Sequence, residues 1–114
     1  MEFSAERIIK FADAHSAIPT RDGKLYADLF HHGTLTLEIY APKGTDLQQP
    51  HTRDELYIVV SGKGTFVVEG RRVEFVPGDA LFAAAGEVHR FEHFSEDLVV
   101  WVVFYGPEGG ELGK

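Results

Sequence analysis

Residues 55–76 read ELYIVVSGKGTFVVEGRRVEFV, three short runs rich in valine, isoleucine, phenylalanine and tyrosine that are separated by glycine. β-Branched and aromatic residues are typical of strands, and glycine accepts the positive φ angles of tight turns. We therefore predict three antiparallel strands in series, with Gly62-Lys63-Gly64 as a hairpin turn between the first two.

The same pattern continues in both directions along the chain. Upstream, residues 25–32 (LYADLFHH) and 34–41 (TLTLEIYA) predict a hairpin. In the second run, Leu35, Leu37 and Ile39 share one face, and the polar residues between them share the other. Downstream, further strands are predicted at ALFAAA (80–85), VHRFEHF (88–94) and LVVWVVFY (98–105). About eight strands spaced near ten residues apart indicate an all-β fold, a small jelly-roll barrel or sandwich.

The two ends of the chain lack this pattern. Ser4, followed by AERIIKFA, suits the start of a short helix. Arg7 stands where a capping box places Glu or Gln, so an extended arm is an equal alternative. We therefore divide the chain into an N-terminal arm or short helix (1–24), one barrel domain (25–106) and a flexible glycine-rich tail (107–114).

Composition narrows the classes of function. The chain has 114 residues, the size of one domain, and a formal net charge of −7 at pH 7. That charge disfavours electrostatic binding, so neither nucleic acid nor a membrane is predicted as a partner. The absence of cysteine excludes disulfides, thiolate metal sites and cysteine nucleophiles. The sequence also has no membrane-spanning run and no secretory signal pattern, so we expect a cytoplasmic location.

Residues 49–55 (QPHTRDE) carry the chemically most informative side chains. In a straight strand, the Cα atoms of His51 and Glu55 would lie about 13 Å apart, too far to share one ion. The polar Thr52-Arg53-Asp54 segment predicts a corner between two strands, which brings His51 back toward Glu55. A helix would also place both on one face, but the β-branched run that follows favours a strand. With His89 on another predicted strand, these side chains predict a metal site.

At these residues the sequence resembles the cupin superfamily, whose first motif reads G-x5-H-x-H-x3-4-E-x6-G. The spacing of His51, Glu55 and Gly62 reproduces the second histidine, the acid and the final glycine. Gln49 stands at the position of the first histidine, and Gly44 is one residue closer to it than the motif requires. A glutamine amide oxygen is a harder and weaker ligand than imidazole, so the alternative is a three-ligand site with water in the fourth place.

The second cupin motif, G-x5-P-x-G-x2-H-x3-N, is matched from Gly78 through Gly86 to His89, with Ala84 at the proline position. His93 replaces the final asparagine, and we place it in the pocket beside the metal rather than among the ligands. The resemblance covers residues 33–105 and implies a single-domain double-stranded β-helix. The metal ligands that it implies are His51, Glu55, His89 and, as the alternative fourth ligand, Gln49.

The alternation of side chains along a strand adds further residues to the candidate pocket. Tyr57 shares the parity of Glu55, and Phe91 shares that of His89, so we place both in the pocket together with His93. The ligand set accepts one divalent transition metal ion, either Zn²⁺, Mn²⁺, Fe²⁺, Ni²⁺ or Cu²⁺. The residue types alone do not select among these ions.

Two histidines and one carboxylate leave coordination positions open for a substrate. The resemblance implies a small metal-binding cupin that takes a small organic acid, a sugar derivative or an aromatic diol. An enzyme of the dioxygenase or isomerase type is the first alternative, and a non-enzymatic binding or storage barrel is the second; no side chain is assigned a catalytic role. Because residues 98–105 are apolar on both faces, we also predict that a second copy covers one sheet in a homodimer.

Overall fold

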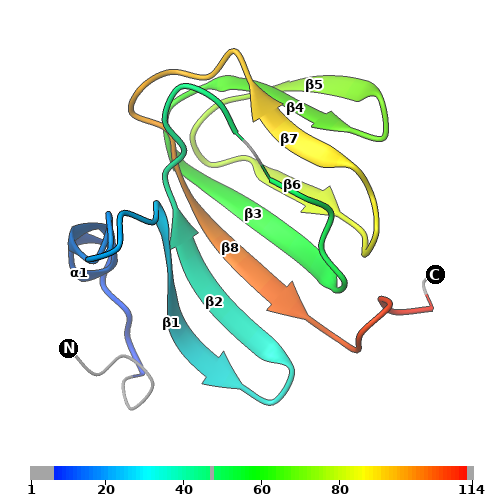
Figure 1. Cartoon of the computed structure of the whole chain (residues 1–114), viewed down its shortest axis with the longest axis horizontal. Helices are drawn as coiled ribbons and strands as arrows, with labels where there is room; N and C mark the ends of the chain where they lie inside the picture. The colour runs from blue at the N-terminus through cyan, green and yellow to red at the C-terminus, as the bar shows by residue number, and fades with distance from the viewer. Residues whose placement is uncertain (1–6, 47, 113–114) are drawn as a thin grey trace.

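The structure is a computed structural model that describes residues 7–46 and 48–112. The strands in this part of the chain are β1 (Tyr26–His32), β2 (Leu35–Tyr40), β3 (Asp54–Ser61), β4 (Gly64–Val68), β5 (Arg71–Phe75), β6 (Ala80–Ala83), β7 (His89–Glu92) and β8 (Val99–Tyr105). They form two antiparallel sheets, one of order β1-β2-β8-β3-β6 and one of order β5-β4-β7 (Figure 1). The prediction of an all-β barrel of the jelly-roll type is confirmed.

The Gly62-Lys63 link is not a hairpin turn, contrary to the prediction of three strands in series. β3 belongs to the larger sheet and β4 to the smaller one, so the chain crosses between the sheets here. Gly62 has a φ of 89°, and a Cβ atom on it would lie 2.5 Å from the Cα atom of Leu98. The Lys63 amide donates to Ser95 Oγ, and the Ser95 amide donates to the Lys63 carbonyl. Glycine is required because the crossing packs directly against the turn before β8.

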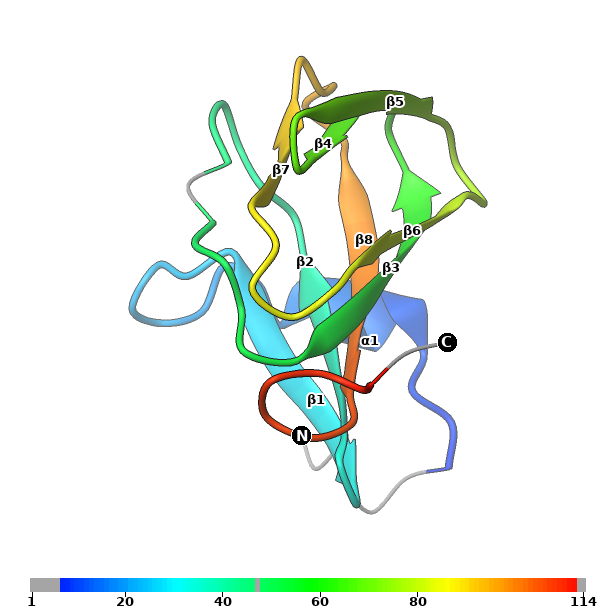
Figure 2. The same ribbon diagram turned by 90° about the vertical axis from the view of Figure 1, so that its right-hand side faces the viewer.

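The main core fills the space between the two sheets. Tyr57 and Val59 of β3 meet Phe66 of β4 and Phe91 of β7 there, and all four are buried. Figure 2 shows that β4, β5 and β7 gather at one end of the molecule, away from β1. The smaller sheet therefore leaves much of the inner faces of β1 and β2 uncovered, although Tyr40 at the end of β2 reaches Phe91 of β7.

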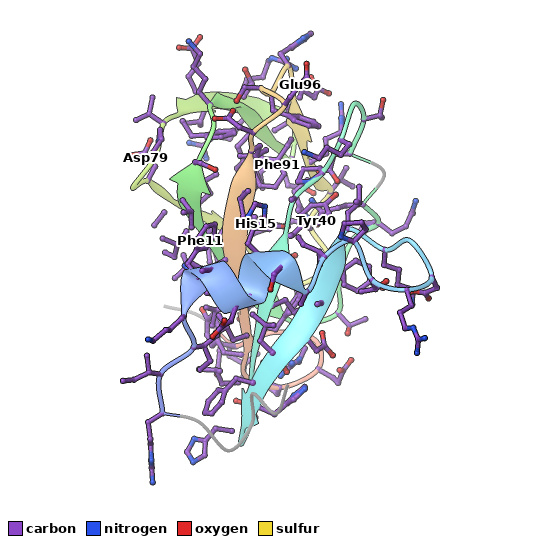
Figure 3. The ribbon with its side chains drawn as sticks, turned by 90° about the vertical axis from the view of Figure 1, so that its left-hand side faces the viewer. Phe11, His15, Tyr40, Asp79, Phe91 and Glu96 are labelled. Carbon is purple, nitrogen blue, oxygen red and sulfur yellow. The ribbon has the colours of Figure 1, made fainter. Side chains whose placement is uncertain are left out.

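Helix α1 (Phe11–Ser16) lies across the outer face of the larger sheet (Figure 3). The predicted start at Ser4 lies outside the described residues. Residues 7–10 are not helical, and Lys10 precedes the helix without a side-chain cap. The chain therefore has a short helix, as one of the two alternatives predicted, but the helix begins at Phe11.

The helix covers part of the apolar outer face of β8. Ala14 is fully buried in a cluster with Ile39 and Val99. Phe11 meets Trp101 edge to face, with ring centroids 5.9 Å apart. Over this part of β8, the N-terminal segment supplies part of the cover; from the sequence we predict a second copy over this face together with help from this segment. No helix among the described residues is long and apolar enough to cross a membrane.

The segment after β8 is tied to the start of β3. Both carboxylate oxygens of the buried Asp54 accept backbone hydrogen bonds, from Ala85 at 2.9 Å and from Glu111 at 2.8 Å. The Gly109 amide donates to the Thr52 carbonyl at 2.7 Å. The region that the sequence analysis assigned to a flexible tail thus makes specific contacts up to Glu111.

Replacing Asp54 by Asn is expected to destabilise the barrel by about 1–3 kcal/mol, because an amide accepts through one oxygen only and leaves one backbone donor unpaired. The hydrogen bonds from Glu111 and Ala85 lower the pKa of Asp54. A lowered folded-state pKa stabilises the protein above the unfolded pKa, and this stability is lost as the pH falls through the folded value. Denaturant unfolding of wild type and Asp54→Asn from neutral to acidic pH tests this, and equal stabilities at neutral pH would contradict it.

Candidate metal centre

Three side chains, one from each sheet and one from the loop before β3, meet inside the barrel. His51 precedes a bend at Thr52 and Arg53, Glu55 is the second residue of β3, and His89 is the first residue of β7. Glu55 Oε1 lies 2.9 Å from Nε2 of His89 and 3.7 Å from Nε2 of His51. One candidate ligand atom from each residue lies within 4.8 Å of the others. The bend therefore brings together the two residues that a straight strand would separate.

The Glu55 carboxylate has an unusual environment for a buried acid. Its side chain is 1% exposed, and neither oxygen has a hydrogen-bond partner. Burying an ionised carboxylate costs several kcal/mol unless a cation or hydrogen bonds compensate. Although Nε2 of His89 is close, it compensates this charge only when it carries a proton or shares a metal ion with the carboxylate. A proton on His89 or a metal ion held between the two side chains would supply that compensation.

The neutral tautomer of His89 is defined by a contact with the backbone. Its Nδ1 lies 2.8 Å from the carbonyl oxygen of Glu87, which only accepts, so Nδ1 carries the proton in the neutral ring. The lone pair of Nε2 then faces the Glu55 carboxylate. Burial by itself lowers the pKa of His89, but the Glu55 carboxylate 2.9 Å away and the hydrogen bond with the Glu87 carbonyl outweigh burial and raise it. An imidazole oriented in this way is typical of a metal ligand.

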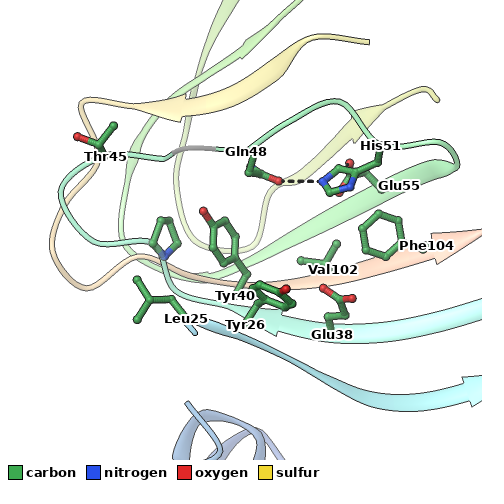
Figure 4. A pocket seen from close by; sticks show the side chains of 11 residues that line it. Leu25, Tyr26, Glu38, Tyr40, Thr45, Gln48, His51, Glu55, Val102 and Phe104 are labelled. Atoms are coloured by element: carbon green, nitrogen blue, oxygen red, sulfur yellow. Dashed lines mark hydrogen bonds and ion pairs between the residues drawn. The ribbon is translucent and has the colours of Figure 1, made fainter. Parts of the chain in front are cut away.

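Gln48, rather than Gln49, reaches this group. The Gln48 Oε1 atom accepts a hydrogen bond from the Tyr57 hydroxyl at 2.8 Å and lies 3.4 Å from Nε2 of His51 (Figure 4). Its amide nitrogen donates to the buried Asp46 at 2.7 Å. Gln49 is exposed and is not among the residues that line the adjoining cavity. Motif spacing cannot distinguish two adjacent glutamines, because loop geometry decides which one points inward.

The structure brings only part of the predicted pocket to the site. The Tyr57 hydroxyl lies 3.1 Å from Nε2 of His89, and the Tyr57 ring packs edge to face on Phe91. Phe91 is 1% exposed and belongs to the core behind the site. His93 is exposed, and its φ of 51° ends the strand alternation on which its placement depended. Its side chain borders a separate hollow with Gly44 and is not brought to the site.

A cavity of about 500 Å³ opens beside His51 and Glu55. Figure 4 shows Gln48, His51 and Glu55 on one side of it, with side chains of β2 and β8 opposite. The lining residues are Leu25, Tyr26, Glu38, Tyr40, Pro42, Thr45, Gln48, His51, Glu55, Val102 and Phe104. Sequence analysis missed most of them. The available signal was the polar face of residues 34–41, which here faces a cavity inside the barrel.

Glu38 is the most perturbed acid in this cavity. It is paired in register with Asp28 of β1 on one side and with Val102 of β8 on the other. Burial, the hydrogen bond and charge of Asp28, and the charge of Glu55 raise the pKa of Glu38 to about 9. Glu38 therefore carries a proton at neutral pH.

This raised pKa predicts a pH-dependent stability. The folded protein keeps the Glu38 proton up to about pH 9, whereas the unfolded chain releases it near 4.5, so stability falls as the pH rises through this window. Glu38→Gln removes the contribution and should be more stable than wild type by about 1–3 kcal/mol at the alkaline end. Urea unfolding as a function of pH measures the effect. The exposed Glu74→Gln on β5 is the control, and parallel curves for wild type and Glu38→Gln would contradict the prediction.

Comparison with known proteins identifies the family to which this fold belongs. Residues 36–105 match the family model for the cupin domain. The uncharacterized protein SCO3923 of Streptomyces coelicolor is 38% identical over 85 residues, covering 73% of this chain and 81% of that protein.

Two solved structures share the fold at low sequence identity. A cupin-2 domain protein from Shewanella frigidimarina has a TM-score of 0.69 at 15% identity, covering 87% of this chain and 95% of its own. KdgF from Halomonas sp. has a TM-score of 0.62 at 22% identity, covering 73% and 78% of the two chains. The family match spans most of the barrel, including His51, Glu55 and His89, and the chain belongs to the cupin superfamily.

Proposed function

We propose that this cupin binds one divalent transition metal ion through Nε2 of His51, Nε2 of His89 and the carboxylate of Glu55. The carrying observation is the buried Glu55 carboxylate, which lacks a hydrogen-bond partner and lies 2.9 Å from an imidazole nitrogen. Gln48 takes the amide position that the motif assigned to Gln49. This set of nitrogen and oxygen donors suits Zn²⁺, Mn²⁺, Fe²⁺, Ni²⁺ or Cu²⁺. When bound, such an ion supplies Lewis-acid chemistry to oxygen atoms of a ligand.

Residues around the ligands hold them in place. The Glu87 carbonyl fixes the tautomer of His89, and Asp46 holds the Gln48 amide. Tyr57 is fully buried and donates its hydroxyl hydrogen to Gln48, so it closes the side of the site toward the core. The side of the site that faces the cavity is where a ligand can approach.

We propose that a small molecule binds in this cavity and that the protein is a metal-dependent enzyme of the dioxygenase or isomerase type. A cavity of about 500 Å³ is large enough for a compact organic molecule beside the metal ligands. Across it, Glu38, whose pKa is raised to about 9, offers a protonated carboxyl group that can donate a hydrogen bond to a bound ligand. Turnover of a panel of small chelating compounds, lost in Glu55→Ala, is the expected result. Ligand binding without turnover would assign the protein to the non-enzymatic binding barrels.

Elemental analysis of protein purified without chelator tests the metal proposal directly. We expect about one transition metal ion per chain, and removal by chelation should lower the melting temperature, because a ligand bound only to the folded state stabilises it. Wild-type protein that contains no metal and takes up none on reconstitution would overturn the proposal.

We also propose a homodimer through the outer face of the larger sheet. An apolar row crosses all of its strands beside α1, formed in register by Phe30, Leu37, Val103, Leu56 and Phe82. Phe82 is 47% exposed and the others are half-buried. Apolar surface of this kind is typical of protein contacts. Sedimentation should show a dimer at micromolar concentration and a monomer for Phe82→Lys; a monomeric wild type would contradict the proposal.

A further inference from the structure

The charged side chains around the cavity are mostly acidic. Glu38 and Glu55 line it, Asp28 lies directly beside Glu38, and no lysine or arginine is among the described residues that line it. The buried Glu55 carboxylate, which has no hydrogen-bond partner, lies at the end of the cavity where the metal is proposed to bind. Asp28 of β1 and Glu38 of β2 lie at the other end of the cavity.

The nearest basic groups on these elements are already engaged. The Arg53 guanidinium donates to the carbonyl oxygens of Thr34 and Gly106 and to Thr36 Oγ1. His31 Nδ1 also lies 3.2 Å from Thr36 Oγ1, and its Nε2 lies 3.9 Å from Asp28 at an exposed position. Lys24 lies at the edge of the cavity, where its Nζ is 5.7 Å from the ring centroid of Tyr26 and 3.7 Å from the Asp22 carboxylate, so this exposed ammonium already has an acidic neighbour. A ligand carboxylate placed over β1 and β2 would consequently find no lysine or arginine among the described residues that line the cavity.

Glu38 points into the cavity from β2, opposite His51 and Glu55, in Figure 4. Two carboxyl groups directly opposite each other on neighbouring strands are destabilising unless they share a proton. The register of β1 and β2 places Asp28 beside Glu38, and burial together with this neighbouring carboxyl group raises the pKa of Glu38. The remaining lone pairs of the pair are acceptors for hydrogen bonds from a ligand.

We propose that the Asp28–Glu38 carboxyl pair selects the ligand, so that the part lying over β1 and β2 presents hydroxyl or amino donors and carries no carboxylate. This inference rests on the proposed metal centre, which anchors the other end of the ligand. Hydroxyl and amino groups satisfy the acceptors, whereas a carboxylate would be desolvated beside like charge without a cation. Of the ligand classes considered from sequence, sugar derivatives and aromatic diols fit, and organic acids with their acid group at this end do not.

Three probe molecules carry the same metal-chelating diol and differ only in the group that would lie over β1 and β2. Comparing them distinguishes the effect of the Asp28–Glu38 pair from the effect of metal binding. They are catechol, 3,4-dihydroxybenzyl alcohol and 3,4-dihydroxybenzoate, titrated anaerobically by calorimetry into Zn²⁺-loaded protein of measured metal content. In wild type we expect the benzoate to bind about tenfold or more weakly than the benzyl alcohol. In the isosteric double variant Asp28→Asn/Glu38→Gln, that ratio should fall to about twofold. The change in ratio between proteins cancels any intrinsic difference in how the two diols chelate zinc.

Exposed Glu74→Gln is the matched control and should keep the wild-type ratio. Asp28→Asn alone, at an exposed position, provides a second test if the double variant does not fold, and it should lower the ratio in the same direction. An unchanged ratio in folded variants would overturn the inference, as would zinc-loaded protein that binds none of the three probes. Failure of wild type to hold zinc would instead overturn the proposed metal centre.

Discussion

Glu55→Gln is expected to abolish stoichiometric metal binding and yet to unfold at a higher temperature than metal-free wild type. The carboxylate is 1% exposed and both oxygens lack hydrogen-bond partners, so in the absence of a cation it destabilises the fold. Glutamine keeps the shape and removes the charge. If Glu55 is kept to hold a metal ion, Glu55→Gln raises the melting temperature of the metal-free protein. If Glu55 only stabilises the fold, the same substitution lowers it, so the melting temperature distinguishes the two roles.

The measurement compares chelated wild type, reconstituted wild type and Glu55→Gln. Because Glu55 raises the pKa of His89 above the ordinary histidine value of about 6.5, the pH is set well above that raised pKa, so that His89 does not neutralise Glu55. We expect the variant to exceed metal-free wild type by about 1–3 kcal/mol, or roughly 4 °C per kcal/mol for a chain of this size. Reconstituted wild type should be the most stable of the three. Glu74→Gln controls for removing an exposed acid. A variant less stable than metal-free wild type would contradict the prediction.

Gln48→Ala and Gln49→Ala are expected to differ sharply in metal affinity. Gln48 Oε1 lies 3.4 Å from Nε2 of His51 and accepts from Tyr57, so its loss removes either a ligand or the group that orients one. Such contacts are worth about 10–100-fold in metal affinity. The side chain of Gln49 is exposed, so its truncation should leave the affinity unchanged.

Competition with a chromogenic chelator measures both affinities on the same scale, and the neighbouring substitutions control for each other. Tyr57→Phe removes the hydroxyl that positions the Gln48 amide and leaves the amide itself in place. The metal affinity of this variant therefore measures how much of the effect of Gln48 depends on that hydrogen bond. A loss of affinity in Gln49→Ala equal to that in Gln48→Ala would return the amide position to the residue that the motif spacing suggested.

The sequence by itself determined the all-β fold and predicted a candidate site of His51, Glu55 and His89, three side chains that lie together in the structure. Alternation of apolar residues and the glycines between runs depend on local backbone geometry, which neighbouring residues largely decide. The spacings of His51, Glu55 and His89 match a motif whose geometry the fold imposes, and the polar Thr52 and Arg53 indicated the bend between the first two. These features are local, or are repeated in a known pattern, and so were accessible without coordinates.

Only the tertiary structure decided which faces became interior. The Gly62-Lys63 link crosses between sheets because it packs on the turn before β8, a contact between residues distant in sequence. Gln48 rather than Gln49 points inward because Asp46 and Tyr57 hold its amide. The polar face of β2, with Glu38, looks solvent-exposed in a single strand, yet it lines a cavity because the small sheet covers only one end of the large one. Strand alternation assigns residues to two faces, but long-range packing decides what each face meets.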